Sequence, residues 1–327
     1  MAKRKQKYSK KIQPAELKIA LQMRSSGYHY VDLSQCASIL NRRFYRQGLN
    51  WAVSHFTFYK ITPTEAGSQG VGVSKLPNSW VMSNAWEKSF RLWQQMIKNS
   101  TDESGAQSIK GKFLDFKVYM NAAHHSAGVA ANLLPVDSVP NTSTPGEWTM
   151  SDITIATDGT GAAVDYELIA IGPNDPGVAP TSGKDAKSLI QGYADSRALP
   201  YTQDPNVPAD ASLNWMIGVF DEANAQDRAV INMLESNGDQ APYPYEGDGT
   251  SIDTMYPGGE SQLPGTRVVG AAYFNAGTNA NKVVIEGDNF PCGLVELYSS
   301  TDDTVSVIVH LVPGSHRGYL AESMTEM

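Results

Sequence analysis

The feature that most constrains the fold of this chain is a run of alternating side chains near its end. Residues 304–312 (TVSVIVHLV) carry Val305, Val307, Val309 and Leu311 at every second position, and the positions between them are mixed. Successive side chains of a β-strand point to opposite faces, so this run predicts a strand with one uniformly apolar face. We expect that face to point into the core and the mixed face to be partly covered.

Similar runs of β-branched and aromatic residues recur along the chain and predict about nine or ten strands. They lie at residues 50–62, 70–77, 112–120, 149–157, 162–172, 212–220, 266–274, 281–287, 293–299 and 304–312. The strands do not alternate with helices, and no repeat of fixed length is present. This pattern indicates an all-β fold, an antiparallel sandwich. A jelly-roll β-sandwich with a few short helices in its long loops is the natural version.

Two segments before residue 100 have a helical pattern. Residues 35–48 predict a short helix with Asp32 or Ser34 as its N-cap and Gly48 as its end. Residues 83–99 repeat large apolar side chains at helical spacing, with Ser83 as the expected cap, which is typical of a helix packed on a sheet. Residues 185–197 and 221–236 also fit helices, and residues 236–265, rich in Gly, Pro and Tyr, predict an exposed loop.

The charge of the chain is divided unevenly along its length. The net charge is −8, yet residues 1–46 hold eleven lysines and arginines against two acidic residues. The rest of the chain holds 15 basic and 32 acidic residues. A basic segment on an acidic body is typical of a tail that binds nucleic acid, because each phosphate neutralised by Lys or Arg releases a condensed counterion.

We therefore predict two parts, a basic disordered arm at residues 1–25 and a sandwich domain at residues 26–327. The first 13 residues contain six cations, no acid and too few apolar residues to pack. A solubilising tail and a nuclear-import signal are alternatives for the arm, and import is compatible with binding. The predicted nucleic-acid-binding residues are Lys3, Arg4, Lys5, Lys7, Lys10 and Lys11 of the arm, with Arg42, Arg43 and Arg46 on or near one side of the 35–48 helix.

No residue pattern indicates catalysis. The chain lacks the glycine-rich nucleotide-binding motifs and the GxSxG nucleophile motif. We expect His124 and His125 on a strand, where neighbours face opposite sides and do not share a metal ion. Cys36 and Cys292 fit two reduced, buried thiols. We therefore expect no enzyme, no cofactor and no metal, although Ca²⁺ between acidic subunits and a glycosidase carboxylate pair stay open.

Two further features bear on partners. The chain has no run of about 18 apolar residues, so we expect no membrane partner. His316 and Arg317, directly after the last predicted strand, either contact a partner subunit or nucleic acid, or bond to their own domain.

Three segments of the sequence resemble a known family. Residues 42–50 (RRFYRQGLN), 75–91 (KLPNSWVMSNAWEKSFR) and 310–321 (HLVPGSHRGYLA) are similar to capsid proteins of small circular single-stranded-DNA viruses known largely from environmental sequence. The resemblance spans most of the chain. It implies a jelly-roll shell subunit of an icosahedral assembly, in a multiple of sixty copies, that packages a single-stranded DNA genome. It also implies residence in the virion, passage through the host nucleus and no catalytic residues.

A carbohydrate-binding or adhesive β-sandwich, such as a viral spike or lectin-like module, is the alternative. The basic arm separates the two hypotheses, because a lectin-like module has no use for six cations in its first eleven residues. The resemblance assigns a function only to the arm cations. It assigns that function to them as a group and not residue by residue. No residue indicates a host receptor.

Overall fold

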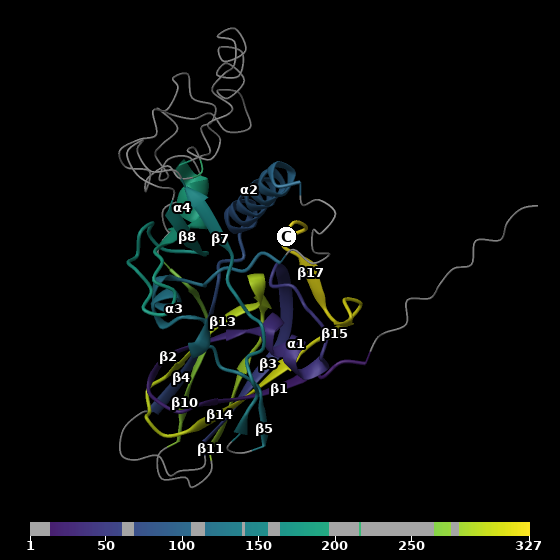
Figure 1. The fold of residues 1–327 in the computed structure, drawn as a ribbon. Coiled ribbons are helices and arrows are strands. Elements are labelled where there is room, and N and C mark those ends of the chain that lie inside the picture. Colours follow the sequence, from purple (N-terminus) through teal and green to yellow (C-terminus); the bar gives the residue numbers. More distant parts are fainter. Residues whose placement is uncertain are drawn as a thin grey trace, which may run out of the picture.

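The computed structural model of the chain describes residues 14–60, 69–105, 115–138, 141–155, 164–195, 216, 265–275 and 281–327. Over these residues the protein is mostly antiparallel β-sheet with a few helices, as the sequence predicts. Figure 1 shows the main sheets together at one end of the molecule and a layer of helices and shorter strands at the other.

The first main sheet has the strand order β1 (Lys18–Met23), β14 (Val305–Leu311), β3 (Leu49–Lys60) and β11 (Asn281–Glu286), and all neighbours are antiparallel. Two short strands, β12 (Asn289–Phe290) and β17 (Ala321–Ser323), also pair with β3. In β14 every second residue from Val305 to Leu311 is buried, and the residues between them are half-buried. This pattern confirms the predicted inward face.

The second main sheet has the order β10 (Arg267–Phe274), β4 (Gln69–Lys75), β13 (Leu294–Ser299) and β2 (Gly27–Asp32), again antiparallel throughout. The pairings of the two sheets are nested. When β1, β2, β3, β4, β10, β11, β13 and β14 are numbered one to eight along the chain, the first pairs with the eighth and the second with the seventh. The third pairs with the sixth and the fourth with the fifth.

One hydrophobic core is shared by the two main sheets. Phe56 and Phe58 of β3 and Val307 of β14 contribute from the first sheet, and Val73 of β4 and Leu297 of β13 contribute from the second. All five side chains are fully buried. Since burying a side chain of this size contributes roughly 1.5–3 kcal/mol, this core holds the sheets face to face as a sandwich.

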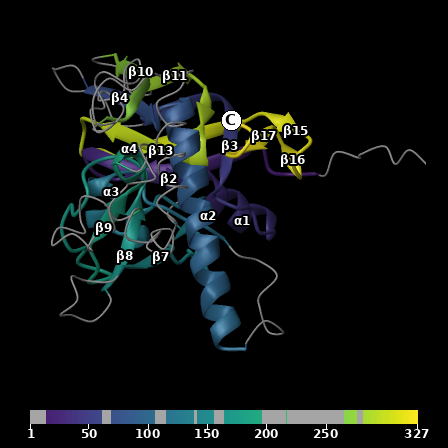
Figure 2. The same ribbon diagram turned by 90° about the horizontal axis from the view of Figure 1, so that it is seen from above.

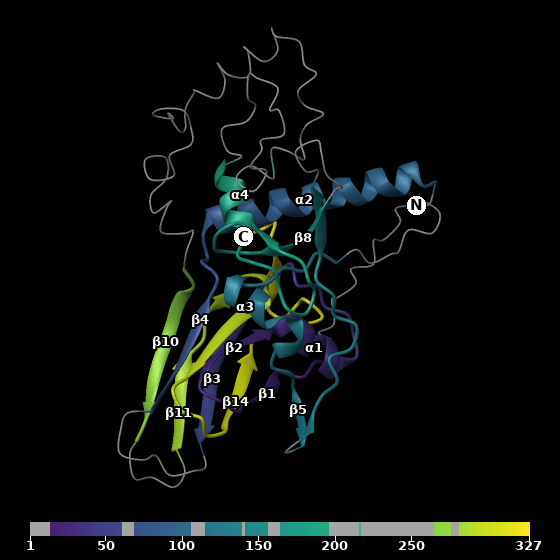
Figure 3. The ribbon, with the colours of Figure 1, turned by 60° about the vertical axis from the view of Figure 1, so that its left-hand side comes forward.

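Residues 76–266 connect β4 to β10, and most of their described part packs over one end of the sandwich, while the segment around residues 136–138 lies beside β1 (Figure 3). A second core joins this layer to the second sheet through contacts that include Trp86, Ile153 and Leu294. In this layer the strands β7 (Asp152–Ile155) and β8 (Val164–Ile169) are antiparallel, and β9 (Ala186–Ser188) runs parallel to β8. The elements are α2 (Trp80–Glu103), α3 (Ala122–Ala127), η2 (Val129–Ala131), β5 (Val136–Ser138), β6 (Asn141–Thr142), β7 (Asp152–Ile155), β8 (Val164–Ile169), β9 (Ala186–Ser188) and α4 (Leu189–Asp195).

The first predicted helix is shorter than expected. Helix α1 (Leu33–Asn41) begins after Asp32, whose carboxylate accepts the N–H groups of Ser34 and Gln35, as predicted. It ends at Asn41 because Arg42 adopts a left-handed conformation with φ 51°. Gly48 does not end the helix. A Cβ at Gly48 would lie 2.4 Å from the Trp86 ring, so α2 packs there only against a glycine.

Two other predicted boundaries are wrong. Helix α2 is capped by Ser79, whose hydroxyl accepts the N–H of Met82, and not by Ser83. With 24 residues, α2 is also not a short helix; in Figure 2 it crosses the molecule and projects beyond the other elements. The predicted helix at 185–197 begins as strand β9 and becomes helical only at Leu189.

The strand predicted at 112–120 does not form over its described residues. Residues 115–120 are irregular apart from a single bridge between Tyr119 and Ile169. The N–H groups of Lys117 and Val118 donate to side chains, the Ser151 hydroxyl at 3.0 Å and the Gln47 amide oxygen at 2.6 Å. Backbone bonds to β8 begin only at Tyr119, whose N–H donates to the Leu168 carbonyl at 2.9 Å, so side-chain hydrogen bonds replace a regular ladder over the first part of the segment.

The predicted boundary of the arm at residue 25 falls too late. Lys18–Met23 is a strand of the first sheet, and Ala15 and Leu17 already pack against the shared core. The described sandwich therefore includes residues well before position 26. The arm residues 1–13, the helix at 221–236, the loop at 236–265 except Gly265, and all of 212–220 except Met216 lie outside the described residues.

Candidate nucleic-acid interface

The described chain enters the sandwich at a fixed point. The N–H of Glu16 donates to Asn41 at 3.0 Å, and the Tyr319 hydroxyl donates to the Glu16 carbonyl at 2.6 Å. Arg43 donates to the carbonyl of Pro14 at 3.2 Å. The place where residues 14–16 meet α1 and Tyr319 is here named the arm root. Lys3, Arg4, Lys5, Lys7, Lys10 and Lys11 precede it and lie outside the described residues.

The three arginines predicted to extend the basic arm lie at the arm root. Arg42, Arg43 and Arg46 are all exposed. They are not on one side of a helix, because α1 ends at Asn41; they lie on the turn that leads from α1 to β3. The structure thus brings them together by a different local geometry from the one predicted.

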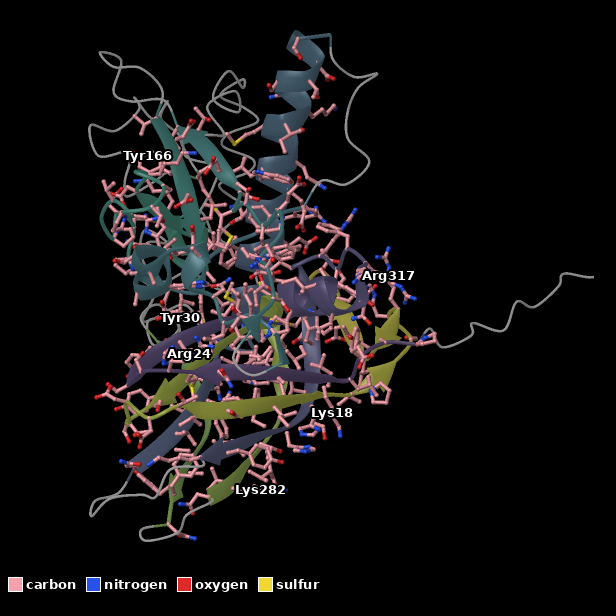
Figure 4. The ribbon with its side chains drawn as sticks, turned by 60° about the horizontal axis from the view of Figure 1, so that its bottom comes forward. Lys18, Arg24, Tyr30, Tyr166, Lys282 and Arg317 are labelled. Carbon is pink, nitrogen blue, oxygen red and sulfur yellow. The ribbon has the colours of Figure 1, made fainter. Side chains whose placement is uncertain are left out.

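Arg317 joins these residues from the other end of the chain. It lies on the turn between β15 (Pro313–Gly314) and β16 (Gly318–Tyr319) and has φ 50°. Its guanidinium donates to the Phe44 carbonyl at 2.6 Å, and its own carbonyl accepts the Tyr45 hydroxyl at 3.1 Å. Figure 4 shows Arg317 and Lys18, the first residue of β1, on the same side of the molecule.

A pocket of about 210 Å³ opens between the two turns. It is lined by Phe44, Tyr45, Arg46, Leu49, His316 and Arg317. Both arginines are exposed, whereas Tyr45 and Leu49 are buried. Burial, and then the neighbouring charge of Arg317, hold the pKa of His316 below its usual value, so the imidazole is neutral at neutral pH.

Buried aromatic side chains form the support behind this pocket. The rings of Tyr45, Trp51 and Tyr319 lie 5.1–5.9 Å apart, in tilted or edge-on orientations favourable for aromatic pairs. The Trp51 indole N–H donates to the Ser34 hydroxyl, which donates in turn to the Arg46 carbonyl, both at 3.0 Å. Arg46 is thus fixed at its backbone while its side chain stays exposed.

Phe44 has its own supports. Its ring centroid lies 6.2 Å from that of Trp148, and the Lys117 ammonium lies 5.7 Å from the Phe44 ring and 4.6 Å from the Trp148 ring. Lys117 is nearly buried and forms an ion pair with Asp115 at 2.6 Å. Its charge is therefore compensated inside the protein, and the exposed cations of this region are those of the arginines.

The histidine pair lies elsewhere and is not on a strand. His124 and His125 both belong to α3 and are buried. His124 accepts the Met120 N–H at 3.1 Å and contacts the Asn132 oxygen at 2.7 Å, whereas His125 lies 2.9 Å from Glu167. The described residues contain no group of three or more His, Cys, Asp or Glu side chains arranged to hold a metal ion.

The two cysteines are free and buried, as predicted. Burial, followed by the charge of Asp32, raises the pKa of both thiols, so neither is a reactive thiolate. None of the helices within the described residues is long and apolar enough to span a membrane.

Comparison of the chain with protein-family models, with curated proteins and with solved structures gave no significant match. The site must therefore be interpreted from its own geometry. It consists of exposed arginines and a small, largely apolar pocket beside the point where a strongly basic segment joins the domain.

Proposed function

We propose that this chain is the capsid subunit of a small single-stranded-DNA virus. In this proposal it assembles with copies of itself into an icosahedral shell and packages the genome through its basic N-terminal arm. It acts in the virion, is assembled by way of the host nucleus, and has no catalytic activity, cofactor or resident metal.

The observation that carries the proposal is the nested pairing of the eight main strands. Pairing of first with eighth, second with seventh, third with sixth and fourth with fifth is expected when a long antiparallel ribbon is wound into two sheets. Double-sheet jelly rolls of this kind build viral capsids, and also lectins. The pairing thus supports a jelly roll but does not by itself separate a shell subunit from a lectin-like module.

The position of the cations favours the shell subunit. The six cations of residues 1–13 lead directly into the arm root, where Arg42, Arg43, Arg46 and Arg317 add exposed positive charge. The body is acidic overall, and the arm together with the arginines at its root forms a concentration of basic charge where the arm joins the domain. A carbohydrate-binding module gains nothing from such a concentration, whereas a subunit that gathers a phosphate backbone needs it.

An exposed apolar face supports self-assembly. On the outer side of the second sheet Tyr28, Tyr273 and Val268 are 63–67% exposed, and Tyr298 is 40% exposed. The Tyr28 and Tyr298 rings lie side by side with centroids 5.1 Å apart. Exposed aromatic side chains on one face are typical of interaction surfaces. The Tyr-rich loop at 242–256, a second candidate contact, lies outside the described residues.

Electron microscopy of the purified full-length protein tests this proposal. We expect closed shells of uniform diameter in negative stain and, after nuclease treatment, protected single-stranded DNA inside them. A protein that stays monomeric across salt and protein concentrations and binds glycans would overturn the proposal and favour the lectin-like alternative.

A further inference from the structure

The pocket at the arm root has the size of a single ring system. Its volume of about 210 Å³ lies below the roughly 300–1,000 Å³ of pockets that take drug-sized ligands. A base pair in a duplex does not enter such a space, whereas one base turned out of a single strand is of the right order.

The lining residues combine two kinds of chemistry. Phe44, Tyr45 and Leu49 supply aromatic and aliphatic surface, and His316 adds a neutral ring with hydrogen-bonding nitrogens. Arg46 and Arg317 supply planar guanidinium groups, which bind phosphate with two parallel hydrogen bonds. None of the six lining residues is acidic. A ligand that fits must carry a flat ring and a negative charge next to each other.

Both arginines are held before any ligand arrives. The Arg317 backbone is fixed by the Tyr45 hydroxyl, and its guanidinium is bound to the Phe44 carbonyl, so it bridges two residues of the opposite wall. The Arg46 backbone is fixed by the buried Ser34 hydroxyl. Such prior ordering lowers the entropy that a ligand must remove on binding.

We propose that this pocket binds one unstacked base and its adjacent phosphate within a single-stranded nucleic acid. The domain itself, and not only the basic arm, then distinguishes single strands from duplexes. The inference rests on the proposed packaging function and assigns the strand's contact to a defined place, next to the point where the arm leaves the domain. Base stacking on aromatic side chains is tolerant of sequence, as packaging of a whole genome requires.

Fluorescence anisotropy with the full-length protein tests the pocket. The probes are a labelled oligo(dT) and a labelled duplex of the same length, each titrated at several salt concentrations. Phe44→Leu keeps apolar volume but removes the aromatic ring, so we expect it to weaken oligo(dT) binding about five-fold or more, with an unchanged salt slope and unchanged duplex binding. Arg317→Gln should weaken oligo(dT) binding and reduce the salt slope by about 0.7, the value for one phosphate contact on a single strand.

Matched variants separate the pocket from general effects. Trp80→Leu removes a 40% exposed aromatic ring from the first turn of α2, and Arg91→Gln removes an exposed arginine of the same helix; neither should change the preference for single strands. Phe44→Tyr keeps a stacking ring and should bind like the unmodified protein. Because a misfolded Phe44→Leu protein would also bind weakly, its melting temperature must match that of Phe44→Tyr.

The outcomes distinguish this inference from the proposed function. If the unmodified protein forms DNA-containing shells but Phe44→Leu and Arg317→Gln keep the full preference for oligo(dT) over duplex, the pocket inference is wrong and the capsid proposal stands. If the unmodified protein binds no nucleic acid and forms no shells, the proposed function fails, and the pocket inference fails with it.

Discussion

At the scale of single residues, β14 offers a matched pair of neighbours with opposite environments. Val307 is fully buried between the main sheets, and Ser306 is half-buried on the other face of the same strand. Truncating Val307 to Ala removes two buried methyl groups and should lower the free energy of unfolding by about 1–3 kcal/mol. Ser306→Ala should change it little. Thermal melts of the two variants as unassembled subunits measure the difference, and a larger loss for Ser306→Ala would contradict the assigned register.

Some residues of the candidate site can be predicted from the sequence, and others cannot. A cation count predicts Arg42, Arg43 and Arg46, because positive charge is visible in the sequence without any knowledge of the fold. The partnership of Arg46 with Arg317 is not visible, since β14 and the following turn bring the last part of the chain back to α1 only through long-range pairing. In the sequence, the turn at Arg317 is visible only as a His-Arg dipeptide after the last predicted strand. That dipeptide does not reveal whether Arg317 contacts a partner or its own domain.

At the scale of elements, the small helix α3 connects the layer of residues 76–266 to the sandwich. The His124 ring stacks on Tyr30 of β2 with centroids 4.4 Å apart and an interplanar angle of 7°. The Met120 N–H occupies His124 Nδ1, so Nε2 carries the proton and donates to Asn132 at 2.7 Å. Burial lowers the pKa of His124 to about 4. The contact between α3 and β2 is therefore built around a neutral imidazole.

This arrangement predicts a loss of stability in mild acid. The unfolded chain protonates His124 below a pH of about 6.5, whereas the folded protein resists protonation until about pH 4. The stabilisation is thus complete above pH 6.5 and is lost as the pH falls towards 4, by on the order of 3 kcal/mol. Urea unfolding of the unassembled subunit at pH 7, 6, 5 and 4 measures it.

The matched variant is His124→Gln, which keeps a neutral polar side chain that does not titrate. Asp32, whose pKa burial raises to about 6, contributes in the opposite direction between pH 3.8 and 6, so only the difference between the two proteins isolates His124. We expect the advantage of the unmodified protein to shrink steadily from pH 7 to pH 4. A difference that does not vary with pH would show that His124 does not carry the effect.

The elements predicted well are those whose pattern and hydrogen bonding agree. Strand β14 alternates in burial and pairs in a ladder with β3, so periodicity alone locates it. Residues 112–120 have the same composition, but the N–H groups of Lys117 and Val118 bond to Ser151 and Gln47, partners that are distant in the sequence. The left-handed Arg42 likewise ends α1 where composition alone favours a longer helix.

At the scale of the whole molecule, the basic charge and the sandwich core belong to different parts of the chain, the arm and the domain. Among the described residues, the first contacts with the sandwich core come from Ala15 and Leu17. The segment of residues 1–13 holds six cations and few apolar side chains, so its composition predicts charge and not core packing. Removing these cations should therefore separate binding from folding.

Deleting residues 2–12 should leave the melting temperature unchanged and strongly weaken binding to single-stranded DNA. Binding to single strands depends on salt with a slope of about −0.7 per neutralised phosphate, so loss of six cations should reduce the slope by up to about four. Anisotropy titrations of oligo(dT) between 50 and 300 mM salt, roughly the range where such slopes are resolved, measure it. A full-length variant with the six cations replaced by Gln is the control for chain length, and it should match the deletion.

The residual binding of both proteins should still prefer single strands over duplexes, because the pocket formed by Phe44, Arg46 and Arg317 is intact. A salt slope unchanged by the deletion would mean that the arm is not the binding element, and the genome contact would then have to lie on the domain alone.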